Sequence, residues 1–298
     1  MRRISSLISG SVFILLVLGF TRCSTPELPV SGYYDYDQEL PLLDSVRLLA
    51  DSSGYSLYYF TYHSIHDRKV TGLLSIPENT NRPVPVIILL HGLGDSKTVD
   101  YIETGNKYLI DAGYAVLRID ICNHGDRYKY DYDFDLIHGY KYWTRDIVAQ
   151  TVFDLRRAVD FIGTRTDLDH DRIGFYGISL GGIIGTVFCG VEKRVKVPVI
   201  VLAGGNLNLM FGTKALSKET KVFLSFIDPI NFVVSVSPRP LLMINAENDE
   251  IVPPVTTKLL YKKAKNPKKI IWYPAKHHTL PVDKAYPDGI RWFDEYLK

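Results

Sequence analysis

Apolar residues along the chain gather into short continuous runs separated by longer amphipathic stretches. The runs long enough to be buried strands are residues 86–90, 114–119, 173–176, 197–202, 241–244 and 270–273. Continuous apolar strands that alternate with helical segments are typical of a mostly parallel sheet with helices on both faces. The pattern therefore predicts an α/β fold, whose ligands should bind at the carboxyl ends of the strands.

Two weaker patterns extend this prediction toward the N-terminus and across one face of the sheet. Residues 56–65 and 69–77 alternate between apolar and polar side chains, which predicts an antiparallel pair of strands leading into the sheet. After Gly139, apolar residues recur at helical spacing, and Arg156 and Arg157 fall largely on the opposite side of the predicted helix. We therefore expect that helix to bury one face and to expose the other.

A serine lies at the apex of a predicted strand, turn and helix. The strand at 172–176 is followed by Gly-Ile-Ser-Leu-Gly at 177–181, and an apolar helical segment comes next. Glycines are needed on both sides of the serine because strand and helix pass too close for a Cβ, and the strained turn holds the hydroxyl exposed. The segment predicts a nucleophile elbow with Ser179 as the nucleophile.

A serine hydroxyl is a poor nucleophile until an oriented imidazole removes its proton, so an acid and a histidine should follow at the ends of later strands. The strand at 241–244 opens into a turn with three carboxylates. We choose Asp249 as the acid and keep Glu247 and Glu250 as competing choices. The strand at 270–273 is followed by two adjacent histidines, His277 and His278, and their position alone leaves both open.

In their order along the chain, these motifs resemble those of the α/β-hydrolase superfamily, and within it the dienelactone-hydrolase and acetyl-xylan-esterase-like serine hydrolases. The likeness covers most of the chain from about residue 70. It includes His-Gly-Leu-Gly at 91–94 after the third strand and the loop at 120–127 after the fourth. In that family the histidine is commonly followed by any residue, leucine and proline, which fits His278. The resemblance thus implies His278 as the base, with His277 in reserve.

The resemblance also implies the remaining parts of such a site. The tetrahedral oxyanion needs two fixed donors. One is the backbone N–H of Leu180, and the resemblance places the second at Leu93, with Gly94 as the near alternative. A small lid is expected over residues 204–238. No cofactor or metal is implied, since His63 and His66 are explained as turn residues and no phosphate-binding or dinucleotide-binding glycine motif is complete.

The expected function is hydrolysis of short-chain carboxylic esters through an acyl-enzyme, because a small lid favours short acyl groups. The tyrosine-rich segment at 128–143 could receive a sugar ring, which would make acetyl esters of carbohydrates candidate substrates, although local packing of the rings is the favoured reading. Three alternatives stay open: a serine peptidase of prolyl-oligopeptidase type, a thioesterase or lipase, and a non-catalytic binding module that kept the fold. Peptidases of that type usually carry a large N-terminal propeller.

The length and charge of the chain and its first residues indicate its domain organisation and its location. With 298 residues, 46% of them hydrophobic, and a formal charge of +2, the chain fits one compact domain and gives no reason to expect a nucleic-acid partner. A basic start precedes an apolar run at 12–20, shorter than the roughly 20 residues of a membrane span but typical of a signal-peptide core. We expect a signal peptide or N-terminal anchor at 1–22, a tether at 23–45 and the hydrolase domain at 46–298.

Export, with a periplasmic or membrane-anchored location, is the expectation that follows. Cys23 lies just after the apolar run, where a bacterial lipoprotein carries its lipidated cysteine. Arg22 departs from the small residue usual before that cysteine. Lipid attachment at Cys23 and an uncleaved N-terminal anchor are therefore alternative routes to a membrane.

Overall fold

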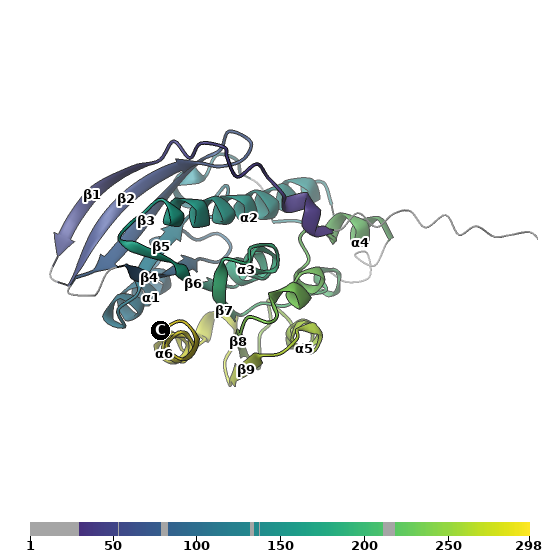
Figure 1. The fold of residues 1–298 in the computed structure, drawn as a ribbon. Helices are drawn as coiled ribbons and strands as arrows, with labels where there is room; N and C mark the ends of the chain where they lie inside the picture. Colours follow the sequence, from purple (N-terminus) through teal and green to yellow (C-terminus); the bar gives the residue numbers. More distant parts are fainter. Residues whose placement is uncertain (1–29, 53, 79–82, 132–133, 137, 211–217) are drawn as a thin grey trace, which may run out of the picture.

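The computed structural model describes residues 30–52, 54–78, 83–131, 134–136, 138–210 and 218–298. Its centre is a nine-stranded sheet with the strand order β1-β2-β3-β5-β4-β6-β7-β8-β9 (Figure 1). The strands are β1 (Ser45–Ser52), β2 (Tyr55–His63), β3 (Lys69–Pro77), β4 (Val84–Leu90), β5 (Ala115–Ile119), β6 (Leu168–Ile178), β7 (Val195–Val201), β8 (Leu241–Ala246) and β9 (Lys268–Tyr273). The predicted α/β fold is confirmed, and each predicted apolar run is one of its parallel strands.

The pairing of neighbouring strands changes once across the sheet, from antiparallel to parallel. Strands β2 and β3 form the antiparallel pair that the alternating pattern at 56–65 and 69–77 predicts. In addition, β1 pairs antiparallel with β2, and β3 pairs antiparallel with β5. From β5 to β9 the neighbours are parallel. The chain passes from β4 outward to β5 and then returns to β6 on the other side of β4. This reversal makes the carboxyl ends of β4 and β6 the place where an open sheet of this kind binds ligands.

Helices cover both faces of the sheet (Figure 1). On one face lie α1 (Asp100–Asp111) and α6 (Val282–Tyr296), and on the other lie α2 (Lys141–Gly163), α3 (Leu180–Val191) and α5 (Pro254–Lys263). Residues of β4 alternate between the two layers, with Val86 and Ile88 in one core and Ile87 and Leu89 in the other. Strands buried on both faces are apolar at most positions, which explains the runs in the sequence.

Residues 30–45 lie against the domain, so the prediction of a tether there is wrong. They begin with the 3-10 helix η1 (Val30–Tyr34), in which Tyr34 is fully buried and donates its hydroxyl proton to the carbonyl of Phe226 at 2.6 Å. Arg156 donates to the carbonyl of Tyr34, and Arg157 donates to that of Leu40 at 2.7 Å. Both arginines are therefore buried under this segment, and the prediction that they face solvent is corrected.

The first 29 residues lie outside the described part of the chain. The signal peptide or anchor at 1–22, lipid attachment at Cys23 and the exported location therefore stay predictions. Among the described residues, none of the helices combines the length and the apolar character that a membrane span needs.

Within the insertion at 204–238, one buried carboxylate joins the first residues to the turn at 228–230. Asp228 accepts the backbone N–H groups of Asn206 and Leu207, each at 2.9 Å, and of Ile230 at 3.1 Å. In the described part of the insertion the regular elements are short: η3 (Leu207–Leu209), α4 (Lys218–Leu224), η5 (Pro229–Asn231) and η6 (Val233–Val236). The ring of Phe223 contacts Tyr142 of α2 with centroids 5.2 Å apart. This part of the predicted lid thus packs on the α2 side of the molecule.

Candidate active site

Ser179 occupies the strained turn between β6 and α3. Its backbone dihedrals are φ 56° and ψ −119°, and its N–H donates to the carbonyl of Val201 at 2.9 Å. A Cβ at Gly181 would lie 2.4 Å from the carbonyl oxygen of His91, and one at Gly177 would lie 2.4 Å from that of Gly181. Glycine is therefore required at both positions, and the predicted elbow is present.

A hydrogen-bonded series joins this serine to a histidine and an acid. The Nε2 atom of His277 lies 2.9 Å from Ser179 Oγ, and its Nδ1 lies 2.8 Å from Asp249 Oδ2. The other oxygen of Asp249 accepts the N–H groups of Ile251 at 2.9 Å and Val252 at 2.7 Å. Because an ionised carboxylate only accepts hydrogen bonds, Nδ1 carries the proton, and Nε2 is left to accept the proton of the serine.

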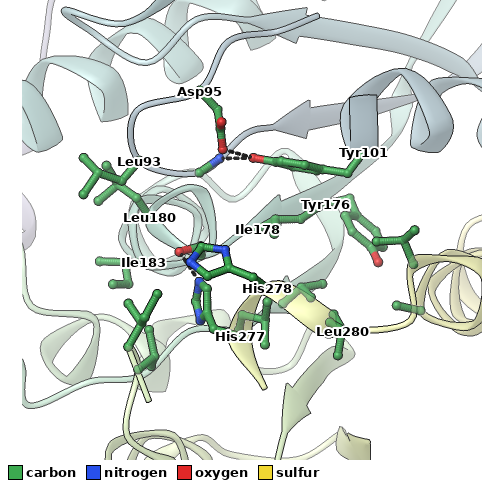
Figure 2. A pocket seen from close by; sticks show the side chains of 18 of the residues that line it. Leu93, Asp95, Tyr101, Tyr176, Ile178, Leu180, Ile183, His277, His278 and Leu280 are labelled. Carbon is green, nitrogen blue, oxygen red and sulfur yellow. Dashed lines mark hydrogen bonds between the residues drawn. The ribbon is translucent and has the colours of Figure 1, made fainter. Parts of the chain in front are cut away.

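The prediction that His278 pairs with Ser179 is wrong by one residue. Both histidines lie in the short 3-10 helix η7 (His277–Thr279), where successive side chains point about 120° apart, so only one of them can turn toward the serine. His277 is buried, with 6% of its surface exposed, whereas His278 is exposed and contacts the ring of His277 edge-on (Figure 2). Of the three candidate acids, Asp249 reaches the histidine, while Glu247 and Glu250 are exposed.

The two residues whose backbone N–H groups are predicted as oxyanion donors lie at the pocket that contains the serine. Leu180 is the first residue of α3, and Leu93 follows β4 on a loop that leaves 47% of its surface exposed. Both line the same pocket as Ser179 (Figure 2). Within the described residues, neither N–H has a protein acceptor. Gly94, the near alternative, is exposed and has a φ of 79°.

His91 holds the loop that carries Leu93. Its Nε2 accepts the N–H of Ile121 at 3.0 Å, so the ring proton is on Nδ1, which donates to the carbonyl of Gly92 at 2.7 Å. The ring is fully buried, and burial lowers the pKa of His91 to about 4. His91 is therefore a neutral structural group at physiological pH, although its sequence position beside the glycines does not reveal this role.

A buried ion pair, which the sequence analysis did not predict, ties the same loop to the next one. Lys97 donates to Asp120 and to Asp126, each at 2.6 Å, and its own backbone N–H donates to Asp120 at 2.7 Å. Asp120 is fully buried at the end of β5. The loops after β4 and β5, which carry two of the family-like motifs, are thereby fastened to each other.

The pocket above Ser179 has a volume of about 570 Å³ and a mostly apolar lining. Its walls come from both helical layers. Phe134, Ile183 and Met210 belong to the layer of α2 and α3, and Tyr176, Leu280 and Tyr286 to that of α1 and α6. Met210 is the one described residue of the 204–238 insertion that lines it. Apolar walls with a few polar groups are typical of small-molecule sites.

Metal ligation finds no support in the described residues, which contain no group of three histidine, cysteine or acidic side chains arranged to hold a metal ion. His66 instead lies 2.9 Å from the amide oxygen of Gln150 through its Nδ1 atom.

The burial of His91 predicts a loss of stability in mild acid. Between about pH 6.5 and 4 the unfolded chain binds a proton that folded His91 does not, so the free energy of unfolding should fall as the pH falls, by up to about 3 kcal/mol across that window. Burial also lowers the pKa of His124, which acts in the same direction. Urea denaturation at pH 7.5 and pH 5 measures the difference.

The matched variants for this prediction are His91→Asn and His170→Asn. The first removes the buried titrating group and should weaken the pH dependence, although the Ile121 N–H then loses its acceptor and stability at pH 7.5 also falls. The second changes an exposed histidine and should behave as wild type. An unchanged pH dependence in His91→Asn would contradict the assignment.

Comparisons with known proteins find relatives among hydrolases and esterases. A family model described as acetyl xylan esterase (AXE1) matches residues 43–202, and a model described as PhoPQ-activated pathogenicity-related protein matches residues 208–297. The putative hydrolase YtaP of Bacillus subtilis is 26% identical over 195 residues, which are 59% of this chain and 64% of that protein. The esterase FrsA of Photorhabdus laumondii is 29% identical over 150 residues, 49% of this chain and 32% of its own. These matches thus span less than two thirds of either relative.

Solved structures share the fold. An acetyl xylan esterase from Paenibacillus sp. R4 is 22% identical, with a TM-score of 0.75 over 92% of this chain and 96% of the other. Acetyl xylan esterase 1 from Thermoanaerobacterium sp. JW/SL YS485 is 16% identical, with a TM-score of 0.74 over 89% and 92%. Because the AXE1 model alone matches more than half of the residues, the chain belongs to the acetyl xylan esterase (AXE1) family of α/β hydrolases.

Proposed function

We propose that the protein is a serine esterase that hydrolyses short-chain carboxylic esters, acetyl esters foremost, through an acyl-enzyme. The observation that carries the proposal is the series Ser179, His277 and Asp249, with contacts of 2.9 and 2.8 Å, at a largely apolar pocket. A nucleophile, a base and an orienting acid in this geometry form the arrangement that activates a serine for acyl transfer.

In the first half-reaction the Oγ atom of Ser179 attacks the ester carbonyl carbon while His277 Nε2 takes the serine proton. Asp249 holds the ring and stabilises its positive charge. The carbonyl oxygen becomes an oxyanion, which the N–H groups of Leu180 and Leu93 are positioned to bind. When the bond to the alcohol oxygen breaks, that oxygen receives the proton from Nε2, and the acyl group stays on Ser179.

Water completes the cycle by the same route. His277 takes a proton from the water as its oxygen attacks the acyl carbon, and the same backbone donors bind the second oxyanion. Collapse of this intermediate breaks the bond to Ser179 Oγ, which regains a proton from Nε2. The carboxylic acid leaves, and the free enzyme is restored.

Two features support a short acyl group. The Tyr176 and Tyr286 rings that line one wall are already stacked on each other, with centroids 4.8 Å apart. Phe223 and Phe226, which would be natural roof residues for a long chain, pack toward α2 and η1 instead. Acetyl is the acyl group named for both solved relatives above, which are acetyl xylan esterases.

Catalytic efficiency should therefore fall as the acyl chain lengthens. Each methylene gains about 0.8 kcal/mol only where the protein covers it, and carbons that project into water gain nothing. The test is kcat/KM for p-nitrophenyl esters from acetyl to decanoyl, with acetylated sugars and a proline-containing peptide amide assayed beside them. A maximum at acetyl or butyryl is expected. A rise through octanoyl and decanoyl would point to a lipase, and cleavage of the amide to a peptidase.

A further inference from the structure

We propose that Tyr101 is a positioning residue of the oxyanion hole: its hydroxyl holds Gly92 so that the following peptide unit presents the N–H of Leu93 to the substrate. The inference rests on the proposed function, because it concerns the same oxyanion. Tyr101 lies in the first turn of α1 and lines the pocket. Its hydroxyl meets both Gly92 and Asp95, the two residues that bracket the predicted donor (Figure 2).

The direction of both hydrogen bonds is fixed by chemistry. The Tyr101 oxygen lies 2.7 Å from Asp95 Oδ2, and an ionised carboxylate only accepts, so the single hydroxyl proton goes to Asp95. The oxygen is then free to accept the N–H of Gly92 at 2.8 Å. Burial raises the pKa of Tyr101, which keeps that proton in place at neutral pH. The Gly92 N–H is thus occupied and is not available to an oxyanion.

The next peptide unit is held from its carbonyl end. The carbonyl of Gly92 accepts from Nδ1 of His91 at 2.7 Å. In a planar trans peptide the C=O and the N–H point in opposite directions, so fixing this oxygen aims the N–H of Leu93 away from His91. A Cβ placed on Gly92 would lie 3.4 Å from the Cβ of Ser179, which shows how near the nucleophile this unit is.

Both bonds are needed because a glycine links the two peptide units. Gly92 has no Cβ and can rotate about both of its backbone bonds, so a bond at one end leaves the other end free. Tyr101 fixes the preceding unit and His91 the following one. Tyr101 is itself fastened, since its carbonyl accepts the hydroxyl of Tyr286 of α6 at 2.8 Å. This series of hydrogen bonds connects the loop that carries Leu93 to the layer of α1 and α6.

The decisive variant is Tyr101→Phe, which keeps the ring and removes both hydrogen bonds. We expect kcat for p-nitrophenyl acetate to fall by roughly tenfold with KM changed by less than about twofold, because a misaligned donor weakens the transition state more than the bound ester. Affinity for a boronic acid that bonds to Ser179 should fall by the same factor as kcat/KM. Tyr108→Phe, a neighbour on α1 that stacks on Tyr286, is the matched control and should equal wild type.

Changes at Asp95 provide an independent second test. Asp95→Asn keeps an acceptor for the Tyr101 hydroxyl and should retain most of kcat, whereas Asp95→Ala leaves the hydroxyl without that acceptor and should lower kcat toward the Tyr101→Phe value. A Tyr101→Phe enzyme with wild-type kcat and boronate affinity overturns the inference, as does equal loss in both Asp95 variants. Absence of turnover in wild type would instead refute the proposed function itself.

Discussion

Ser179→Ala is expected to abolish ester turnover, with a loss on the order of 10⁴-fold to 10⁶-fold in kcat. The hydroxyl is the atom that forms the acyl-enzyme, and the other groups at the elbow are backbone N–H donors that cannot replace it. Stability should stay close to wild type, because the variant removes one hydroxyl at the pocket and keeps the strained turn. Steady-state assays with p-nitrophenyl acetate and a thermal melt measure the two quantities.

Labelling separates loss of chemistry from loss of fold. A fluorophosphonate should modify wild type at Ser179 and leave Ser179→Ala unlabelled. Ser235→Ala, which removes an exposed hydroxyl from η6, should label and turn over as wild type does. Turnover in Ser179→Ala within about tenfold of wild type, after correction for contaminants, would refute a serine mechanism.

The parallel strands could be predicted because burial on both faces leaves its mark in the sequence of each strand separately. Strands such as β4 and β6 are covered by helices on both faces, so they must be apolar along most of their length, and that leaves a plain signal in the sequence. The edge strand β1 gave no such signal. Each of its described side chains is exposed, so nothing in its composition marks it as part of a sheet.

The nucleophile and the acid could be predicted for a similar reason. The close approach of Gly181 to His91 requires glycine. The elbow therefore needs a pattern of residues that few other structures need, and this pattern can be recognised in the sequence. Asp249 follows directly from a buried strand, in a turn that its own carboxylate stabilises by accepting the N–H groups of Ile251 and Val252. At the elbow and at the Asp249 turn, the residues that determine the local geometry are neighbours in the sequence.

Contacts between segments that only the tertiary fold brings together could not be predicted. Tyr34 is buried against Phe226, 192 positions away, and nothing near Tyr34 separates a packed segment from a polar tether. Tyr101 accepts the N–H of Gly92 through a hydroxyl that is equally suited to solvent. In each case the partner is chosen by the tertiary fold, which the residue types alone do not specify.

The adjacent histidines show the limit of motif spacing. The family-like pattern after His278 is correct as a sequence match, yet it does not say which way a side chain in a 3-10 turn will point. The geometry selects His277, since Nδ1 lies 2.8 Å from Asp249 and Nε2 lies 2.9 Å from Ser179. Successive side chains in a 3-10 turn point about 120° apart, so an alignment that is wrong by one residue selects the wrong histidine.

His277→Ala should therefore reduce kcat on the order of 10⁴-fold or more, whereas His278→Ala should keep kcat within about tenfold of wild type. Loss of His277 removes the group that takes and returns the proton, and it leaves the Asp249 carboxylate without its partner. His278 is exposed at the pocket wall, so its loss changes contacts with the substrate but leaves the proton path intact. Initial rates of p-nitrophenyl acetate hydrolysis measure both. The reverse ranking would mean that the ring of His278 replaces that of His277 beside Ser179 in the working enzyme.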